Sequence, residues 1–244
     1  MIRRTAIFVI LCLFFSASGP GSAPDAIPQD WHEAWRSFGV DPHLAEAVVW
    51  PEFERYDGLR DMLETAAVYG ASFTPAGEID MSIGLFQMKP SFVEGMEKAW
   101  MESGLEGPCE LRFDVSGSPS SCRERISRMR KDEWQVIYLG IFLRLLYHAY
   151  GSFDSAGRRI QDGLETLPLR DQVQLAANAY NRGCEWFRAG CGNPDLLRVN
   201  LDKETFPRIL IPSERKRQYS YSALAWEHYK LSVGKTDGAN GLQL

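Results

Sequence analysis

Long apolar runs, cysteine motifs and alternating strand patterns are all scarce in this 244-residue chain. The apolar run Ala6–Phe15 is too short to span a bilayer and no stop-transfer pattern follows it, so we expect no stable membrane span. No Cys-x-x-Cys pair occurs and the histidines lack ligand-like spacing, so we expect no metal site, and no cofactor is implied. The net charge of −5 and the shortage of basic clusters argue against a nucleic-acid partner.

The first 18 residues have the pattern of a secretory signal sequence. Arg3 and Arg4 precede the apolar run, and the small residues Ser16–Ser18 follow it. Cys12 lies inside the run after a leucine, where a lipoprotein site would have a small residue, so we interpret it as part of the signal, with lipidation as the alternative. The pattern predicts an exported protein that is periplasmic or associated with the cell wall.

Four cysteines remain after the signal: Cys109, Cys122, Cys184 and Cys191. An even number in an exported chain suggests disulfides, and four cysteines allow three pairings. Proximity in the sequence favours Cys109–Cys122 and Cys184–Cys191, each closing a surface loop.

The hydrophobic pattern from Asp30 onward is helical nearly everywhere, with no internal repeat and no second domain boundary. It predicts one all-α domain over residues 30–233, between a flexible leader (19–29) and a loose tail (234–244). We expect Pro51 to end or kink the second helix of this domain, because proline has no N–H to donate. The predicted helices cover about 30–38, 43–50, 58–69, 90–102, 133–150, 169–180 and 213–231.

Two finer expectations accompany this pattern. The helix after Asp57 should turn Leu59, Met62, Leu63, Ala66 and Ala67 inward. The basic run at residues 123–131 should be a solvated helix face, because most charge runs are.

Glu52 stands out because Trp50, Pro51 and Phe53 surround it at a predicted helix end. Poor solvation disfavours a carboxylate and holds its proton to higher pH, as a general acid near neutrality requires. The alternative is that Glu52 is a solvated residue just past a helix.

Two further segments accompany Glu52 in a fixed order. Residues Ser82–Pro90 read Ser-Ile-Gly-Leu-Phe-Gln-Met-Lys-Pro, and residues Ala179–Gly183 read Ala-Tyr-Asn-Arg-Gly. The three pieces together resemble soluble lytic transglycosylases of the lysozyme-like superfamily, which have a catalytic glutamate, Gly-Ala-x-Gly-Leu-Met-Gln-x-x-Pro and Ala-Tyr-Asn-x-Gly. A later family element, Glu-Thr-Arg-x-Tyr, is matched only loosely by Arg217-Gln218-Tyr219 with Glu214 nearby.

The resemblance implies a single lysozyme-like helical domain with a substrate groove for peptidoglycan glycan strands. It implies that Glu52 protonates the bond between N-acetylmuramic acid and N-acetylglucosamine and then acts as a base, which leaves a 1,6-anhydromuramoyl end. The residues it implies for substrate binding are Ser82, Gly84, Leu85, Phe86, Gln87, Tyr180 and Asn181.

The sequence departs from the family pattern in ways that leave alternatives open. Phe53 replaces the serine after the glutamate, Met81 stands in place of the first glycine, and the gap from Glu52 to the turn is long. That gap supplies Glu78 and Asp80, either of which could position water as acids do in goose-type lysozymes, or could simply be solvated. The other candidates are therefore a hydrolysing muramidase, an enzyme acting on chitin or chitosan, and a non-catalytic wall-binding protein.

Overall fold

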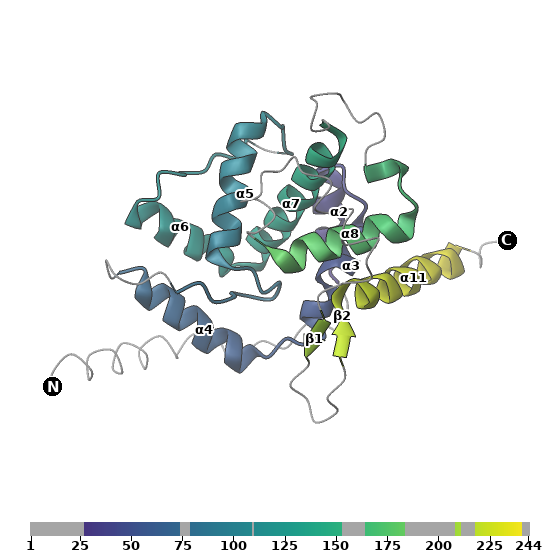
Figure 1. Cartoon of the computed structure of the whole chain (residues 1–244), viewed down its shortest axis with the longest axis horizontal. Helices are drawn as coiled ribbons and strands as arrows, with labels where there is room; N and C mark the ends of the chain where they lie inside the picture. Colours follow the sequence, from purple (N-terminus) through teal and green to yellow (C-terminus); the bar gives the residue numbers. More distant parts are fainter. Residues whose placement is uncertain are drawn as a thin grey trace.

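The computed structural model describes residues 27–73, 79–108, 110–152, 164–183, 208–210 and 218–240. These residues are predominantly helical, which confirms the predicted all-α class (Figure 1). No helix within these ranges is both long and apolar enough to cross a membrane. The helices are α2 (Gln29–Ser37), α3 (Pro42–Phe53), α4 (Gly58–Ala71), α5 (Pro90–Ser103), α6 (Pro119–Met129), α7 (Asp132–Ser152), the short 3-10 helix η1 (Leu164–Thr166), α8 (Leu169–Arg182) and α11 (Tyr221–Asn240).

Side-chain caps and prolines set the helix starts that the sequence predicted. The Asp41 carboxylate accepts a hydrogen bond from the His43 N–H at 2.9 Å, and Pro42 occupies the first position of α3. The Asp57 carboxylate accepts from the Leu59 N–H at 3.0 Å at the start of α4. These contacts satisfy N–H groups that have no partner within the helix.

Helix α3 continues through Pro51 and ends at Phe53, two residues beyond the proline. Pro51 removes one hydrogen bond from the last turn, and the Glu54 N–H keeps the turn closed by donating to the Trp50 carbonyl at 3.1 Å. Glu52 therefore lies in the final turn of a helix, as the sequence predicted.

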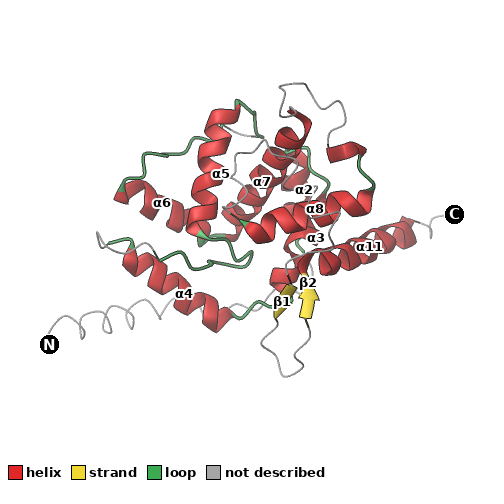
Figure 2. Ribbon diagram, in the orientation of Figure 1, coloured by secondary structure: helices red, strands yellow, loops and turns green. Residues whose placement is uncertain are grey.

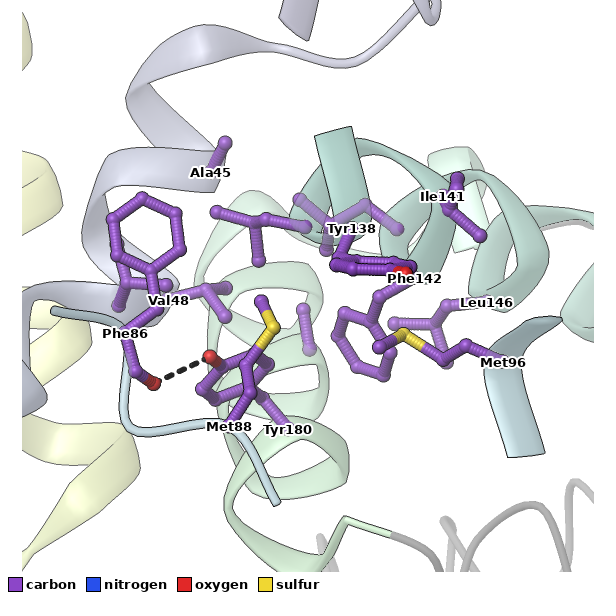
Figure 3. Close-up of a cluster of buried hydrophobic side chains, with 14 of the residues drawn as sticks. Ala45, Val48, Phe86, Met88, Met96, Tyr138, Ile141, Phe142, Leu146 and Tyr180 are labelled. Carbon is purple, nitrogen blue, oxygen red and sulfur yellow. Dashed lines mark hydrogen bonds between the residues drawn. The ribbon is translucent and has the colours of Figure 1, made fainter. Parts of the chain in front are cut away.

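Helix α7 forms the centre of the core and packs against α2, α5 and α6 (Figure 1). The apolar residues that helical spacing places on one face of α5 are all buried: Phe92, Val93, Met96 and Trp100. Figure 3 shows Met96 beside side chains of α7, which contributes the following buried residues: Val136, Tyr138, Leu139, Ile141, Phe142, Leu143, Leu145 and Leu146.

Helix α11 packs on α3 and α8 and joins the end of the chain to the Glu52 region. The Tyr221 hydroxyl donates to the Val48 carbonyl at 2.9 Å, and His228 Nε2 lies 2.7 Å from a Glu46 carboxylate oxygen. His32 Nε2 lies 3.0 Å from the other Glu46 oxygen. Burial opposes ionisation of Glu46, but the two histidines outweigh burial and hold its pKa below the usual value.

The end of the chain differs from the prediction in two respects. Helix α11 begins at Tyr221 and continues to Asn240, into the segment from Gly234 that was expected to be a loose tail. No proline interrupts these residues, and isolated glycines weaken a helix without ending it. Two short strands, β1 (Arg208–Leu210) and β2 (Gln218–Ser220), pair antiparallel (Figure 2). The second strand lies where the start of the last helix was expected, and the first lies in a segment for which no helix was predicted.

The predicted inward face of α4 is wrong. Leu59 and Leu63 are 55% and 47% exposed, whereas Val68 is buried. Helix α4 lies at the edge of the molecule and contacts α6, where the Arg130 guanidinium packs over the Tyr69 ring (Figure 1). A peripheral helix buries only a narrow stripe, so its apolar residues outnumber the positions that the core can cover.

The basic run at residues 123–131 is solvated only in part: Arg130 and Lys131 are exposed, whereas Arg125 and Arg128 are buried. Arg125 Nε donates to a Glu97 carboxylate oxygen at 2.7 Å, and Arg128 Nη2 donates to the other at 3.0 Å. The Tyr138 hydroxyl also donates to Glu97, at 2.6 Å. Glu97 lies 28 residues before Arg125 in the sequence. The local charge pattern therefore could not indicate this partner, and it assigned the arginines to solvent.

Several predictions fall outside the described residues. These are the signal (1–18), most of the leader, and three of the four cysteines: Cys109, Cys184 and Cys191. Cys122 lies on α6, which begins at Pro119, so the residues just before Cys122 are helical and not part of the expected surface loop. The disulfide pairings remain predictions.

Candidate active site

Glu52 projects from the last turn of α3 into a largely buried environment, with 13% of its side chain exposed. The Arg55 guanidinium donates to the Glu52 carboxylate at 2.6 Å and, through Nε, to the Pro51 carbonyl at 3.0 Å. Burial raises the pKa of Glu52, and the charge and hydrogen bond of Arg55 oppose this increase without overcoming it. The carboxyl therefore holds a proton more tightly than an exposed glutamate does.

The turn within Ser82–Pro90 is a tight hairpin closed by backbone hydrogen bonds between Ile83 and Met88, at 2.8 and 3.2 Å. Gly84 has φ +73°, and a Cβ there would lie 1.5 Å from Gln135 Nε2. The buried Gln135 side chain, from α7, accepts from the Phe86 N–H at 2.7 Å and donates to the Met129 carbonyl at 2.6 Å. The turn thus needs glycine at position 84 both for its backbone angle and for space.

Tyr180, from α8, joins this turn to the Glu52 region. Its hydroxyl donates to the Phe86 carbonyl at 2.7 Å, the contact drawn in Figure 3. Burial and the nearby Glu52 carboxylate raise the pKa of Tyr180 well above its usual value. The three segments that the sequence singled out are therefore brought together at Glu52.

The side chains of the turn differ in what they can contact. Phe86 is fully buried against the rings of Trp31 and Phe53, with centroid distances of 5.5 Å to each, so its side chain lines no open surface. Leu85 is also buried, whereas Ser82 and Gln87 are half-buried.

Asn181 follows Tyr180 in the last turn of α8 and is half-buried. Gly183 ends that helix with φ +59°, so the Ala-Tyr-Asn-Arg-Gly segment also serves as a helix terminus.

Tyr221 is a member of the site that the sequence did not indicate. It is fully buried at the start of α11, and the charge of the Glu52 carboxylate contributes to raising the pKa of its phenol. Its hydroxyl donates to the carbonyl of Val48, one turn before Glu52 on α3, at 2.9 Å. The contact with Val48 spans 173 residues, so no local pattern could have indicated it.

Asp61, near the start of α4, is the second residue that the sequence did not indicate. Its Oδ1 accepts from the Gly84 N–H at 2.5 Å and from Gln87 Nε2 at 3.2 Å, and its Oδ2 accepts from the Tyr56 hydroxyl at 3.2 Å. Burial raises the pKa of Asp61 despite these hydrogen bonds. In the sequence, an aspartate near a helix start ordinarily indicates only a favourable interaction with the helix dipole, so Asp61 did not stand out.

Of the two acids suggested for water positioning, Glu78 and Asp80, the structure describes only Asp80. Glu78 lies outside the described residues. Asp80 caps α5, because its two carboxylate oxygens accept from the Ser91 N–H at 3.0 Å and the Ser91 hydroxyl at 2.7 Å. Its carboxylate is therefore already engaged in holding a helix start.

The described residues also form one depression away from Glu52. An open depression of about 670 Å³ lies at the α6–α7 junction, lined by residues 130–134, and is distinct from the Glu52 environment. Within the part of the chain that the structure describes, no group of three or more His, Cys, Asp or Glu side chains is arranged to hold a metal ion.

Comparisons with models of protein families, with curated proteins and with solved structures found no match to this chain. What the site can do therefore rests on its own chemistry. It contains a buried carboxyl with a raised pKa, an arginine in contact with it, two buried tyrosines beside it and a rigid turn that carries one half-buried amide. A carboxyl that holds its proton to higher pH than usual can donate that proton to a substrate and take it back.

Proposed function

We propose that the protein is a peptidoglycan lytic transglycosylase that cleaves the β-1,4 bond between N-acetylmuramic acid and N-acetylglucosamine. The observation that carries this proposal is Glu52 itself, a largely buried carboxyl with a raised pKa. The two segments that resemble the transglycosylase motifs lie next to it. Exported, wall-associated localisation is the expectation that accompanies this activity.

In the proposed reaction, protonated Glu52 gives its proton to the glycosidic oxygen as the bond to C1 breaks. The resulting carboxylate then takes the proton of the muramoyl 6-hydroxyl, whose oxygen bonds to C1 and closes the 1,6-anhydro ring. Arg55 stabilises the carboxylate between these two steps, because it already donates to it at 2.6 Å. A nucleophile within the sugar needs no second carboxylate, unlike the two-carboxylate glycosidases.

A hydrolysing muramidase is the second candidate, and Asp61 is the observation that favours it. Asp61 is a half-buried carboxyl in contact with Gln87, whereas Asp80 is exposed and holds the start of α5. If water attacks in place of the 6-hydroxyl, the product carries a reducing end.

The test compares wild type with Glu52→Gln on purified peptidoglycan, by the rate at which soluble fragments are released. Loss of a general acid should lower this rate by about 10²–10⁴-fold. Glu54→Gln is the matched control, because Glu54 is an exposed carboxyl two residues along the same helix end, and it should retain activity. Equal release by wild type and Glu52→Gln would overturn the assignment of the acid.

Chitin oligomers assayed beside peptidoglycan address the substrate class. We expect fragments from peptidoglycan and none from chitin, because the proposed substrate is the N-acetylmuramic acid unit, whose 3-O-lactyl group is absent from chitin. Cleavage of chitin alone would show that the substrate is a polymer of N-acetylglucosamine and not peptidoglycan. Binding of peptidoglycan with no fragments from either polymer would make it a wall-binding protein.

A further inference from the structure

The Gln87 side chain is held by two hydrogen bonds from the same nitrogen. Nε2 donates to the Gly84 carbonyl at 2.8 Å and to Asp61 Oδ1 at 3.2 Å. The Gly84 carbonyl can only accept a hydrogen bond, and so can the ionised Asp61 carboxylate. The atom that lies between them must therefore be the nitrogen of the Gln87 amide and not its oxygen. The orientation of this amide is therefore fixed by its surroundings.

This orientation leaves the amide oxygen of Gln87 available. Both N–H groups of Nε2 have acceptors, and among the described residues no group donates to Oε1. The side chain is half-buried, so its oxygen can be reached from solvent. Gln87 can thus offer an acceptor to a ligand and has no further donor to offer.

The backbone beneath this amide is held by the same aspartate. Gln87 has φ 51°, in the left-handed region that non-glycine residues seldom adopt, and its N–H donates to the Gly84 carbonyl at 3.0 Å. Asp61 Oδ1 also accepts from the Gly84 N–H, at 2.5 Å. One carboxylate oxygen on α4 therefore ties together the two ends of the four-residue turn, and Gln135 holds the turn from the α7 side.

We propose that Asp61 is a positioning residue that fixes Gln87 with its amide oxygen towards the substrate, so that Gln87 selects a hydrogen-bond donor of the glycan. The donor is a sugar hydroxyl or the N–H of an N-acetyl group. An ether oxygen or a carboxylate cannot satisfy it. This inference rests on the proposed function of the site and adds the chemical group that Gln87 recognises.

Asp61→Asn separates positioning from acid or base chemistry. An asparagine oxygen in place of Oδ1 still accepts from Gly84 and Gln87, and its N–H₂ can donate to the Tyr56 oxygen, so the positioning contacts survive. Asp61→Ala removes them. If Asp61 instead held or moved a proton, as a water-positioning acid in a hydrolase does, Asp61→Asn would be as impaired as Asp61→Ala.

Binding is measured by titrating soluble glycan oligomers of alternating N-acetylglucosamine and N-acetylmuramic acid into the full chain carrying Glu52→Gln, which prevents turnover. We expect Asp61→Ala and Gln87→Met each to weaken binding about tenfold, as loss of one hydrogen bond does. The double variant should be no weaker than Gln87→Met, since Asp61 acts through Gln87. Asp61→Asn should stay close to the Glu52→Gln background. Loss of binding in Asp61→Asn, or multiplicative losses in the double variant, would overturn the proposal.

The rate at which the Gln87 side-chain amide protons exchange with solvent, measured by NMR, tests the same hydrogen bonds without any substrate. Both protons should be protected in wild type and in Asp61→Asn and exposed in Asp61→Ala. Should Asp61→Ala fail to fold, the comparison of wild type with Asp61→Asn still decides the case, because rapid exchange in either would contradict the geometry. Protection without any cleavage of peptidoglycan would leave the positioning intact and overturn only the proposed function.

Discussion

The Arg55 guanidinium lies 2.6 Å from the Glu52 carboxylate, three residues further along the chain. A second hydrogen bond, from Arg55 Nε to the Pro51 carbonyl at 3.0 Å, fixes the arginine at the helix end. The charge favours ionised Glu52, whereas burial favours the protonated form, and burial prevails. The balance between burial and this ion pair therefore sets the pH range over which Glu52 holds its proton.

Arg55→Gln should move the alkaline limb of the pH–rate profile to higher pH. Removing the positive charge raises the pKa of Glu52 further, so the protonated acid persists as the pH rises. Release of fragments from peptidoglycan, measured across pH at constant ionic strength, gives the profile. Arg55→Lys keeps the charge and should keep the limb near its wild-type position. A limb that is unmoved in Arg55→Gln would show that Glu52 does not set it.

Glu52→Gln should make the folded protein more stable at neutral pH. A carboxyl whose folded pKa is raised destabilises the fold once it is ionised, so the penalty is absent below its ordinary value of 4.5 and grows as the pH rises. Arg55 loses its partner in this variant, but a quarter of its side chain is exposed and can be hydrated. Thermal unfolding across pH should show no difference between the two proteins at acidic pH and a higher midpoint for Glu52→Gln at neutral pH. The reverse order would contradict the raised pKa.

Gly84→Ala should destabilise the turn more than an alanine at a comparable glycine does. A left-handed backbone alone costs about 1 kcal/mol or more, and overlap of the new Cβ with Gln135 should add about 1–3 kcal/mol. Gly117→Ala is the control, because Gly117 has φ +70° with no atom within 4 Å of its would-be Cβ. Denaturant unfolding measures both variants. Equal losses would mean that Gln135 moves aside freely.

Glu97→Gln should be among the most destabilising single changes in the chain. It removes the charge that pairs with the buried Arg125 and Arg128, and breaking a buried pair costs about 3–5 kcal/mol. The matched control is Glu110→Gln, whose partner Arg112 is exposed, and we expect a change of about 0–1 kcal/mol there. A loss below about 1 kcal/mol in Glu97→Gln would show that the network contributes little.

The sequence predicted the parts of the fold that local chemistry sets. Asp41 and Asp57 cap helices close to where the pattern predicted helix starts. The apolar face of α5 is buried, as its helical spacing indicates. The errors arise where the tertiary environment decides. Leu59 and Leu63 have helical spacing but lie on a helix at the edge of the molecule, and the α6 arginines find a carboxylate on another helix.

The candidate site follows the same division. Glu52, the turn around Gly84 and the Tyr180 segment carry local patterns, and the structure brings them together. Asp61 and Tyr221 carry none, because their importance comes from contacts 23 and 173 residues away in the chain. Sequence reasoning placed the second acid in the segment just before the turn, at Glu78 or Asp80, whereas the carboxylate that contacts Gly84 and Gln87 comes from α4.

The most direct test of the central claim is mass spectrometry of the fragment ends that wild type and Glu52→Gln release from purified peptidoglycan. We expect wild type to yield 1,6-anhydromuramoyl ends, lighter by one water than reducing ends, and Glu52→Gln to yield almost none. Reducing ends from wild type would show that water completes the reaction and that the protein is a hydrolase. Anhydro ends in equal amounts from both proteins would contradict the role of Glu52.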